Sequence, residues 1–449
     1  MINLKSMLLA VAAFTSMNNA FAYNESDLKK INEFKVGGNV VDFTGLDLSG
    51  ADLSGLELEG VNLKGANFIG ANLTRAKFSN VDLSGSNLSS VKMHLFEAVN
   101  VVLNGTKLIG ADLSSSSWFE ADFSKSKLKN VNFSEADLTG SSFIGLNLGS
   151  LNFSDSTLDE ALLSGSVITR KTNLDGSSLE GANLVNVSIT NRLALSKVDT
   201  LEGANLSGTT FKNILLTDID INGADLSGST FVGVEFSGSD LSSINSIGAV
   251  FDNCKMNASK FDGANLSGST FKNMRFLGYQ NTITSFKEAT LNSVKFPKGM
   301  TIRYADFSGA SLKSIRLKKA KLTSVNFSGA DFSGADLRGS RFMGSNMNEK
   351  NRVILSNAIF DGTDMRKAKL TTVVLDGASF VKTRLKSSQI TIEKGINGKI
   401  LNVAGLTFDS SNLENSWLPT CKVAMHIDFG SSNLSGTKCG GSTDCGRCK

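Results

Sequence analysis

The sequence contains very few of the residues that most often carry catalysis and metal binding. Its 449 residues include 2 histidines, 2 tryptophans and 3 tyrosines. The histidines, His94 and His426, are far apart in the sequence and occupy different places in its pattern. They therefore do not predict a shared catalytic or metal site.

Long apolar runs are missing as well, except near the N-terminus. After residue 22, no run reaches the 18 or so apolar residues that a membrane-spanning helix requires. Residues 1–22 themselves read as a secretory signal peptide, with Lys5, an apolar stretch and the small-x-small site Ala20-Phe21-Ala22. We expect cleavage after Ala22, a secreted or periplasmic location, and no transmembrane segment in the mature chain. An uncleaved apolar cap is the alternative.

What the sequence does contain is one five-residue phrase, repeated along almost its whole length. The phrase is a small residue, Asp or Asn, Leu or Phe, Ser or Thr, and often Gly, as in Ala51–Gly55, Ala264–Gly268 and Ala330–Gly334. A helix turns by about 100° per residue, so a period of five would spread the Leu and Phe side chains around its axis. A flat strand would place successive repeats on opposite faces. The period works if the chain turns one corner per repeat, which points every Leu or Phe inward.

This pattern resembles the pentapeptide-repeat family, over roughly Asp42 to Ser435. The resemblance implies an all-β fold, a right-handed, four-sided parallel β-helix with about four repeats per coil. It does not imply one activity. Some members of that family protect DNA gyrase by imitating duplex DNA, which requires an acidic rod in the cytoplasm.

The sequence suggests four segments: the signal peptide (1–22), an N-terminal cap (23–41), the β-helix (42–418) and a cysteine-containing C-terminal cap with residual repeats (419–449). Residues 24–36 predict a short helix with Ser26 as its N-cap, covering the first open coil. A partner-binding arm is the alternative for that helix.

Four of the five cysteines lie near the C-terminus: Cys421, Cys439, Cys445 and Cys448. In an exported chain we expect two disulfides, whose connectivity the sequence leaves open among three possibilities. A zinc site formed by Cys439, Cys445, Cys448 and either Cys421 or His426 is one alternative, and a redox-active Cys445-x-x-Cys448 pair is the other. Cys254 lies two places before Met256, in the slot that small residues fill elsewhere, so we expect it to be buried.

The chemistry of an enzyme is otherwise absent. The many aspartates recur directly before a central Leu or Phe, where corner formation explains them better than acid–base catalysis does. Most phenylalanines, and Trp118, fall at central inward positions, so they offer no platform for stacking nucleic-acid bases. We therefore predict a protein that is not an enzyme, holds no cofactor and does not bind nucleic acid.

Charge is unevenly distributed along the chain. Residues 1–250 carry 17 Lys and Arg against 27 Asp and Glu, whereas residues 251–400 carry 25 against 11. If residues twenty apart lie one coil apart, three basic pairs stack on outward positions: Lys318 with Arg338, Lys321 with Arg341, and Arg366 with Lys386. We predict that these six residues bind an anionic partner such as lipid head groups, an acidic polysaccharide or an acidic protein. A solvated face with screened charges is the alternative.

Together these observations predict an exported, non-catalytic structural or interaction protein that meets a macromolecular partner, a protein or an anionic envelope or polysaccharide component, through its outer faces. Homodimer formation is compatible with such a rod. A DNA-mimicking protein that interacts with gyrase is the first alternative, and a redox or metal-binding protein that uses the C-terminal cysteines is the second.

Overall fold

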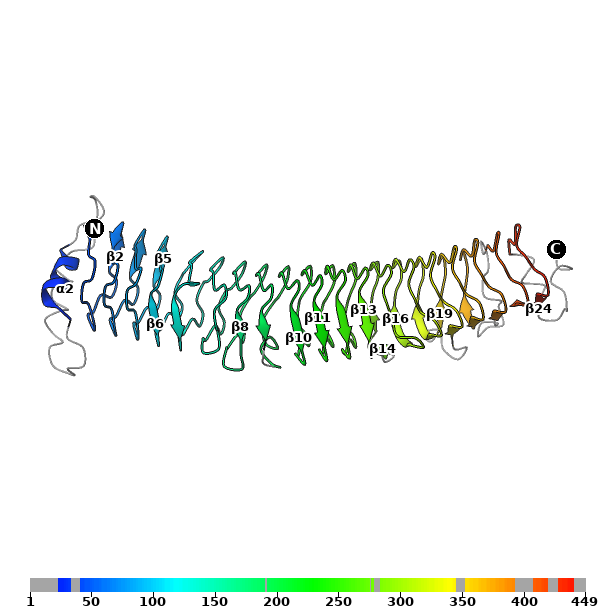
Figure 1. The fold of residues 1–449 in the computed structure, drawn as a ribbon, viewed down its shortest axis with the longest axis horizontal. Helices are drawn as coiled ribbons and strands as arrows, with labels where there is room; N and C mark the ends of the chain where they lie inside the picture. The colour runs from blue at the N-terminus through cyan, green and yellow to red at the C-terminus, as the bar shows by residue number, and fades with distance from the viewer. Residues whose placement is uncertain are drawn as a thin grey trace. The chain divides into compact units, whose positions relative to one another are not determined.

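The computed structural model describes residues 23–33, 41–189, 192–274, 276–277, 283–344, 352–391, 407–418 and 427–439. The chain forms two compact units, Met1–Leu201 and Glu202–Lys449. Within each unit, successive coils stack through parallel strand pairs (Figure 1). The predicted signal peptide lies outside the described residues. The limits predicted for the cap and β-helix segments remain predictions.

Unit 1 holds one short helix and nine short strands among its described residues. The helix is α2 (Glu25–Asn32). The strands are β1 (Val41–Asp42), β2 (Glu57–Glu59), β3 (Val61–Asn62), β4 (Lys77–Ser79), β5 (Glu97–Val99), β6 (Lys107–Ile109), β7 (Lys127–Lys129), β8 (Val167–Ile168) and β9 (Ser188–Ile189). Pairing is parallel throughout, as β1–β3, β2–β4–β5, β6–β7 and β8–β9.

Unit 2 holds two larger parallel sheets. One consists of β10 (Thr210–Lys212), β11 (Thr230–Val232), β12 (Val250–Asp252) and β13 (Thr270–Lys272). The other runs in the order β14 (Phe276–Leu277), β16 (Thr301–Asp306), β17 (Lys321–Asn326), β18 (Arg341–Met343), β20 (Lys369–Thr371), β22 (Gln389–Thr391), β23 (Trp417–Leu418) and β24 (Lys438–Cys439). Three more strands pair beside this path: β15 (Thr284–Ser285), β19 (Val353–Ile354) and β21 (Val373–Val374).

The strand register confirms the predicted parallel β-solenoid. Phe211 pairs with Phe231, Phe231 with Phe251, and Phe251 with Phe271, so one coil takes twenty residues, or four repeats. The register lengthens where residues are inserted; Arg341, for example, pairs with Lys369. The right-handed sense and the four-sided cross-section remain predictions from the family resemblance.

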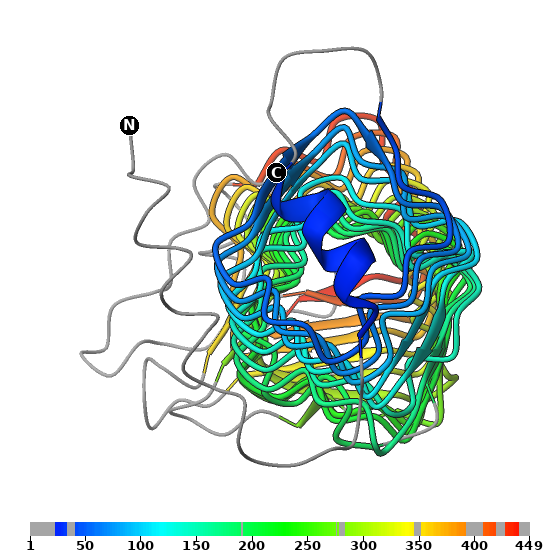
Figure 2. The ribbon, with the colours of Figure 1, turned by 90° about the vertical axis from the view of Figure 1, so that its left-hand side faces the viewer.

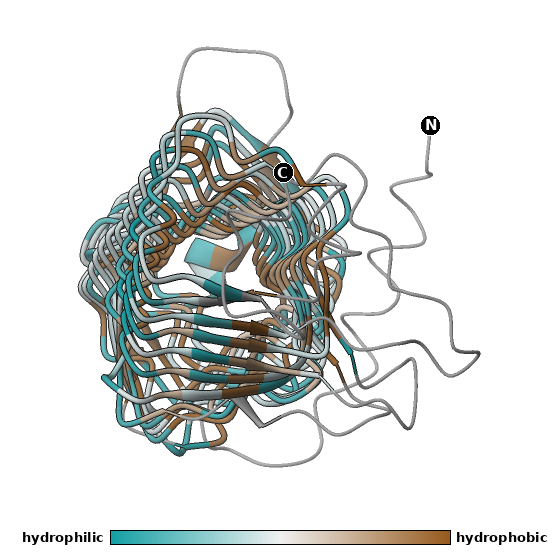
Figure 3. Ribbon diagram, turned by 90° about the vertical axis from the view of Figure 1, so that its right-hand side faces the viewer, coloured by the Kyte–Doolittle hydropathy of each residue, from teal (hydrophilic) through white to brown (hydrophobic). Residues whose placement is uncertain are grey.

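The inward Leu and Phe side chains form a continuous core in each unit. Phe211, Phe231 and Phe251 are fully buried, and their rings stack on the rings of the neighbouring coils at centroid distances of 4.9–5.0 Å. Trp118 is buried in the same way in unit 1, as predicted. Hydrophobic and hydrophilic residues alternate along the coils (Figure 3), and the neighbours of a buried central residue are exposed, as Thr210 and Lys212 are beside Phe211.

Aspartates and asparagines before the central residue have a structural role, as the sequence predicts. Asp82 Oδ1 accepts the backbone N–H of Ser84 at 2.8 Å, which closes the corner after the central Leu83. Such side chains also bond between coils, because Asn132 donates to Asp112 Oδ1 at 3.0 Å. These carboxylates therefore hold corners and ladders together.

The residue two places before each central residue fills a small buried slot. Where this residue is Ser or Thr, its hydroxyl often donates to a central carbonyl of the previous coil, as Ser229 Oγ does to Leu206 at 2.7 Å. Cys254 makes the same kind of contact, with its Sγ 3.4 Å from the carbonyl oxygen of Phe231. The predicted buried spacer role of Cys254 is confirmed, and burial raises the pKa of its thiol to about 11.

Helix α2 covers the first coil of unit 1 (Figure 2). Its Leu28 and Ile31 are buried, and Asp27 Oδ2 accepts the backbone N–H of Asp47 at 3.1 Å. The helix lies within the predicted range 24–36, but its N-cap is Asn24, whose Oδ1 accepts the N–H of Ser26 at 3.0 Å. The choice of Ser26 as the cap was therefore wrong, and the covering role of the helix is confirmed. Nowhere in the described part of the chain is a helix long and apolar enough to cross a bilayer.

Candidate functional site

Basic residues gather along one line of unit 2, where four successive coils pass the same corner. The line consists of residues 316–321, 336–341, 364–369 and 384–389, here called the basic edge. Backbone bridges align the first residues of these segments (Arg316, Asp336, Asp364 and Arg384), and strand pairing aligns the last (Lys321, Arg341, Lys369 and Gln389). The four segments hold 11 Lys and Arg against 2 Asp.

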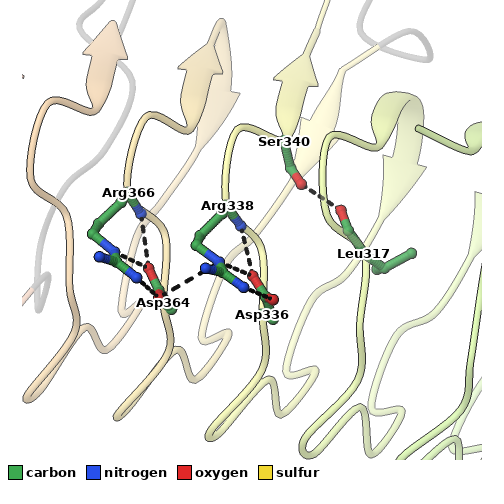
Figure 4. Close-up of polar contacts among 6 residues, drawn as sticks. All are labelled: Leu317, Asp336, Arg338, Ser340, Asp364 and Arg366. Atoms are coloured by element: carbon green, nitrogen blue, oxygen red, sulfur yellow. Dashed lines mark hydrogen bonds and ion pairs between the residues drawn. The ribbon is translucent and has the colours of Figure 1, made fainter. Parts of the chain in front are cut away.

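The repeat explains why these side chains point outward. In every segment the second residue is a buried central residue and the fifth occupies a buried small slot, as Leu317 and Ala320 do. Ser340 fills that slot in the second segment, and its hydroxyl donates to the carbonyl of Leu317 at 2.6 Å (Figure 4). The side chains at the remaining positions therefore point to the surface. The core thus fixes the backbone beneath the cations.

One column on the basic edge contains Lys318, Arg338, Arg366 and Lys386. Backbone hydrogen bonds set its register: the N–H groups of Lys319, Gly339 and Lys367 donate to the carbonyls of Arg338, Arg366 and Lys386 at 2.9, 3.0 and 3.1 Å. The structure therefore brings together the predicted neighbours Lys318 and Arg338, and likewise Arg366 and Lys386. It also joins the two pairs into one column, which the sequence did not suggest.

Two aspartates neutralise much of this column (Figure 4). Arg338 donates to Asp336 through Nε and Nη2 at 2.8 and 2.6 Å, and Arg366 donates to Asp364 in the same way at 2.9 and 2.6 Å. The Nε of Arg338 also lies 3.7 Å from Asp364. The stacked like charges inferred from the sequence are therefore interleaved with carboxylates.

These contacts hold the two aspartates in their charged form. The hydrogen bond from Arg338 lowers the pKa of Asp336, and the charge of Lys318 contributes to the same effect. For Asp364, partial burial acts to raise the pKa, but the hydrogen bonds and charge of Arg366 outweigh it and the pKa is lowered. At the far end of the column, Lys386 lies 3.0 Å from Glu414.

The second column contains Lys321, Arg341 and Lys369, here called the open column. Lys321 pairs with Arg341 as predicted, and Arg341 pairs with Lys369 in the next coil. All three side chains are exposed, and none forms an ion pair or a side-chain hydrogen bond with any residue that the structure describes. Their charges are therefore available to a partner.

Sequence reasoning missed five exposed cations of the basic edge: Arg316, Lys319, Lys367, Lys369 and Arg384. The alignment of Lys369 with Arg341 was not predicted, because residues inserted after Met343 lengthen the coil. Lys369 therefore lies 28 rather than 20 positions after Arg341. Lys319 and Lys367 lie at the corner itself, in the left-handed region with φ of 60° and 61°, where Gly is the usual residue. The interrupted repeat around residues 345–351 was the signal that could have identified Lys369.

The other predicted sites remain untested. Cys421, Cys445 and Cys448 lie outside the described residues, and of Cys439 only the backbone, in β24, is described. Across the described ranges, no three His, Cys, Asp or Glu side chains come close enough to hold a metal ion. His94 is exposed, as predicted, and its Nδ1 lies 3.1 Å from the carbonyl oxygen of Ser114.

Comparison with known proteins identifies the repeats. The family described as "Pentapeptide repeat region" matches residues 248–327. The family described as "Pentapeptide repeats (8 copies)" matches residues 57–94, 99–134, 119–155, 200–238 and 351–386. No curated protein matches the chain.

Three solved structures illustrate the likeness. HetL, a pentapeptide repeat protein involved in heterocyst differentiation regulation in Nostoc sp. strain PCC 7120, is 20% identical, with 73% of this chain and 90% of HetL covered and a TM-score of 0.12. The plasmid-mediated fluoroquinolone resistance protein QnrB1 is 19% identical, with 57% and 88% covered and a TM-score of 0.16. A pentapeptide repeat protein from the Arabidopsis thaliana thylakoid lumen is 28% identical, with 22% and 66% covered and a TM-score of 0.13.

With TM-scores this low, the three structures add nothing to the fold described above. The family matches stand independently of them: together they cover more than half of the chain and fall on the stacked coils of both units. The chain therefore belongs to the pentapeptide-repeat family.

Proposed function

We propose that this protein is a non-catalytic interaction protein, exported from the cell that makes it, and that it binds an anionic macromolecule through the basic edge. The observation that carries the proposal is the gathering of 11 cations on four aligned segments that contain only 2 acids. A solvated face that served only solubility would not require cations to collect at one corner.

The segments half a coil away on the same coils provide the contrast. The equivalent segments ten residues earlier, 306–311, 326–331, 354–359 and 374–379, contain no Lys or Arg and 3 Asp. The charge of these coils is therefore sorted around the axis, with one positive corner and one weakly negative corner. Such sorting orients an anionic partner toward the basic edge and raises its rate of association.

The acidic residues and the cysteine that the structure describes in the coils have structural roles. The aspartates that recur along the coils close corners and bridge ladders, as Asp82 and Asp112 do. The thiol of Cys254 is buried and its pKa is raised, which makes it a poor nucleophile. A DNA mimic would have to present sustained negative charge, and the basic edge of unit 2 presents the reverse.

Removal of four cations tests the function. We expect K318Q/K321Q/R341Q/K369Q to bind anionic polymers and anionic vesicles much more weakly than wild type at low salt. Each cation near an anionic surface contributes about 1 kcal/mol, so the four together correspond to a loss of about a hundredfold or more. Arg338 and Arg366 are left in place because their partners Asp336 and Asp364 would otherwise be stranded.

A matched control removes the same charge elsewhere in unit 2. Lys255, Lys287, Lys313 and Lys382 are exposed lysines outside the basic edge. Their replacement by Gln lowers the net charge equally, and we expect binding close to that of wild type. Equal losses in the two quadruple variants would show that net charge alone governs binding and would contradict the proposal.

Export is the second half of the proposal and rests on residues 1–22 of the sequence. Mass spectrometry of the protein recovered from cell fractions tests it. A mature chain that begins at Tyr23 in the periplasmic or extracellular fraction supports export. A full-length chain confined to the cytoplasm contradicts export and leaves the binding test unaffected.

A further inference from the structure

The cations of the open column repeat from one coil to the next. The spacing of these coils can be followed from the stacked phenylalanine rings in their core. The ring centroids are 4.9 Å apart between Phe332 and Phe360 and 4.7 Å apart between Phe360 and Phe380. Lys321, Arg341 and Lys369 lie on successive coils of this stack. A partner that engages all three at once must therefore carry negative charges that repeat along a line at a similar spacing.

The basic edge offers charge and almost nothing else. Its four segments contain no aromatic residue. Its large apolar residues, Leu317, Leu337, Met365 and Leu385, are all buried in the core. Its other outward groups are small or polar, such as Gly339, Ser387 and Gln389.

This composition discriminates among anionic partners. Single-stranded nucleic acids are held largely by stacking on exposed aromatic side chains. Anionic membranes attract basic clusters, but stable peripheral binding normally adds apolar side chains or a lipid anchor that enters the bilayer. Protein interfaces draw most of their affinity from buried aromatic and Arg anchors in well-packed pockets. Clusters of Lys and Arg alone are typical of patches that bind heparin-like polysaccharides or nucleic-acid phosphates, and the missing aromatic residues disfavour single-stranded nucleic acid.

We infer that the basic edge binds a linear acidic polysaccharide, bearing carboxylate or sulfate groups, that lies along the stack of coils. This inference rests on the proposed function and specifies its partner. The open column contacts the acidic groups of successive sugars. Lys319 and Lys367, two coils apart at the adjoining corner, contact the same chain from one side.

The backbone at the corner makes Lys319 and Lys367 good positions for a test substitution. Their φ angles of 60° and 61° are unfavourable for any residue with a Cβ atom, and Gly339 occupies the same place in the coil between them with φ of 67°. Glycine would suit positions 319 and 367 better as far as folding is concerned. Many other corners of the chain also carry a non-Gly residue with positive φ, Lys382 and Ser387 among them, so the change to glycine at positions 319 and 367 should leave the fold intact.

The test compares two triple variants of the full mature chain. The probe is a size-graded series of heparin-derived oligosaccharides, measured by calorimetry at physiological ionic strength. We expect K321Q/R341Q/K369Q to bind the longer fragments about tenfold or more weakly than wild type. The control K287Q/K313Q/K382Q loses the same three charges away from the basic edge and is expected to stay within about threefold of wild type. Equal losses in the two variants would overturn the inference.

A second variant guards against loss of structure. K319G/K367G removes two cations while placing glycine where the backbone favours it, so we expect its thermal stability to equal or exceed that of wild type. Its affinity for the longer oligosaccharides should nevertheless fall by about threefold or more. Unchanged affinity would show that the corner lysines do not contact the polymer.

Two further arms separate this inference from the proposed function. Affinity that rises with oligosaccharide length and exceeds affinity for phosphatidylserine vesicles or single-stranded DNA of equal charge supports a linear polysaccharide. Vesicles or DNA bound as tightly as the longest oligosaccharide would overturn the polysaccharide assignment while leaving an anion-binding edge. Wild-type protein that binds none of these probes would contradict both proposals.

Discussion

Replacing Phe251 with alanine is expected to lower the free energy of unfolding by about 3–5 kcal/mol. Phe251 is fully buried, and its ring stacks between Phe231 and Phe271 at centroid distances of 5.0 and 4.9 Å. The neighbouring coils are tied to the same backbone ladder, so they cannot close the cavity that the missing ring leaves. Chemical denaturation followed by circular dichroism measures the loss.

Lys272 supplies the control for that substitution. It pairs with Asp252 in the same sheet, but its side chain is exposed. Lys272→Ala should therefore change the unfolding free energy by less than about 0.5 kcal/mol. If Phe251→Ala were as mild as its control, Phe251 could not lie inside a packed column, and the inward placement of the central residues would be wrong.

The second large effect concerns binding, and its sign is unusual: Asp364→Asn is expected to strengthen polyanion binding while weakening the fold. Asp364 accepts two hydrogen bonds from Arg366 and lies 3.7 Å from Nε of Arg338. Asparagine keeps a side-chain oxygen for the backbone N–H of Arg366 but removes the charge that holds both guanidinium groups. The released arginines should raise affinity for heparin about fivefold to tenfold.

The accompanying loss of stability should be modest. Both arginines are partly exposed, so the ion pairs contribute only about 1 kcal/mol between them. Asp331→Asn is the matched control, because it also removes one negative charge and one lysine partner, Lys313, at 3.2 Å. We expect it to leave heparin binding near the wild-type level. Weaker binding by Asp364→Asn, or an equal gain in both variants, would contradict the role assigned to the basic edge.

The fold was readable from the sequence because one physical constraint recurs in every repeat. A buried Leu or Phe every five residues allows only a coil that turns once per repeat, and the pairing of Phe211 with Phe231 confirms the coil of twenty residues. The exact start of α2 was not readable in the same way. Asn24 and Ser26 are both good N-caps, and in the structure Asn24 Oδ1 accepts the N–H of Ser26.

The candidate site was readable only in part. The outward direction of Lys321 and Arg341 follows from their offset from a central residue, and the strand pairing agrees with it. The contacts of Arg338 and Arg366 were missed because an Asp two places earlier was assigned to corner formation alone. In fact Asp336 accepts both the backbone N–H and the guanidinium of Arg338. Lys369 required the register across an insertion, which only the structure supplies.

Outward charged residues in these coils are of two kinds: those whose side chains bond to the backbone of a corner, and those whose charges can contact a partner. An outward Asp directly before a central residue is committed to its own corner, as Asp82 is. An outward Lys at the same place has no such backbone duty, because it cannot accept a hydrogen bond. Runs of Lys or Arg at this place in successive coils, such as Lys321, Arg341 and Lys369, are therefore the positions to search for partner contacts.

Hydrogen–deuterium exchange of the mature protein, with and without a long heparin fragment, tests the central claim most directly. Our account predicts slower exchange on binding in residues 316–321, 336–341, 364–369 and 384–389, with the segments ten residues earlier unchanged. Protection spread evenly around the coils, or confined to unit 1, would contradict the assignment of binding to the basic edge.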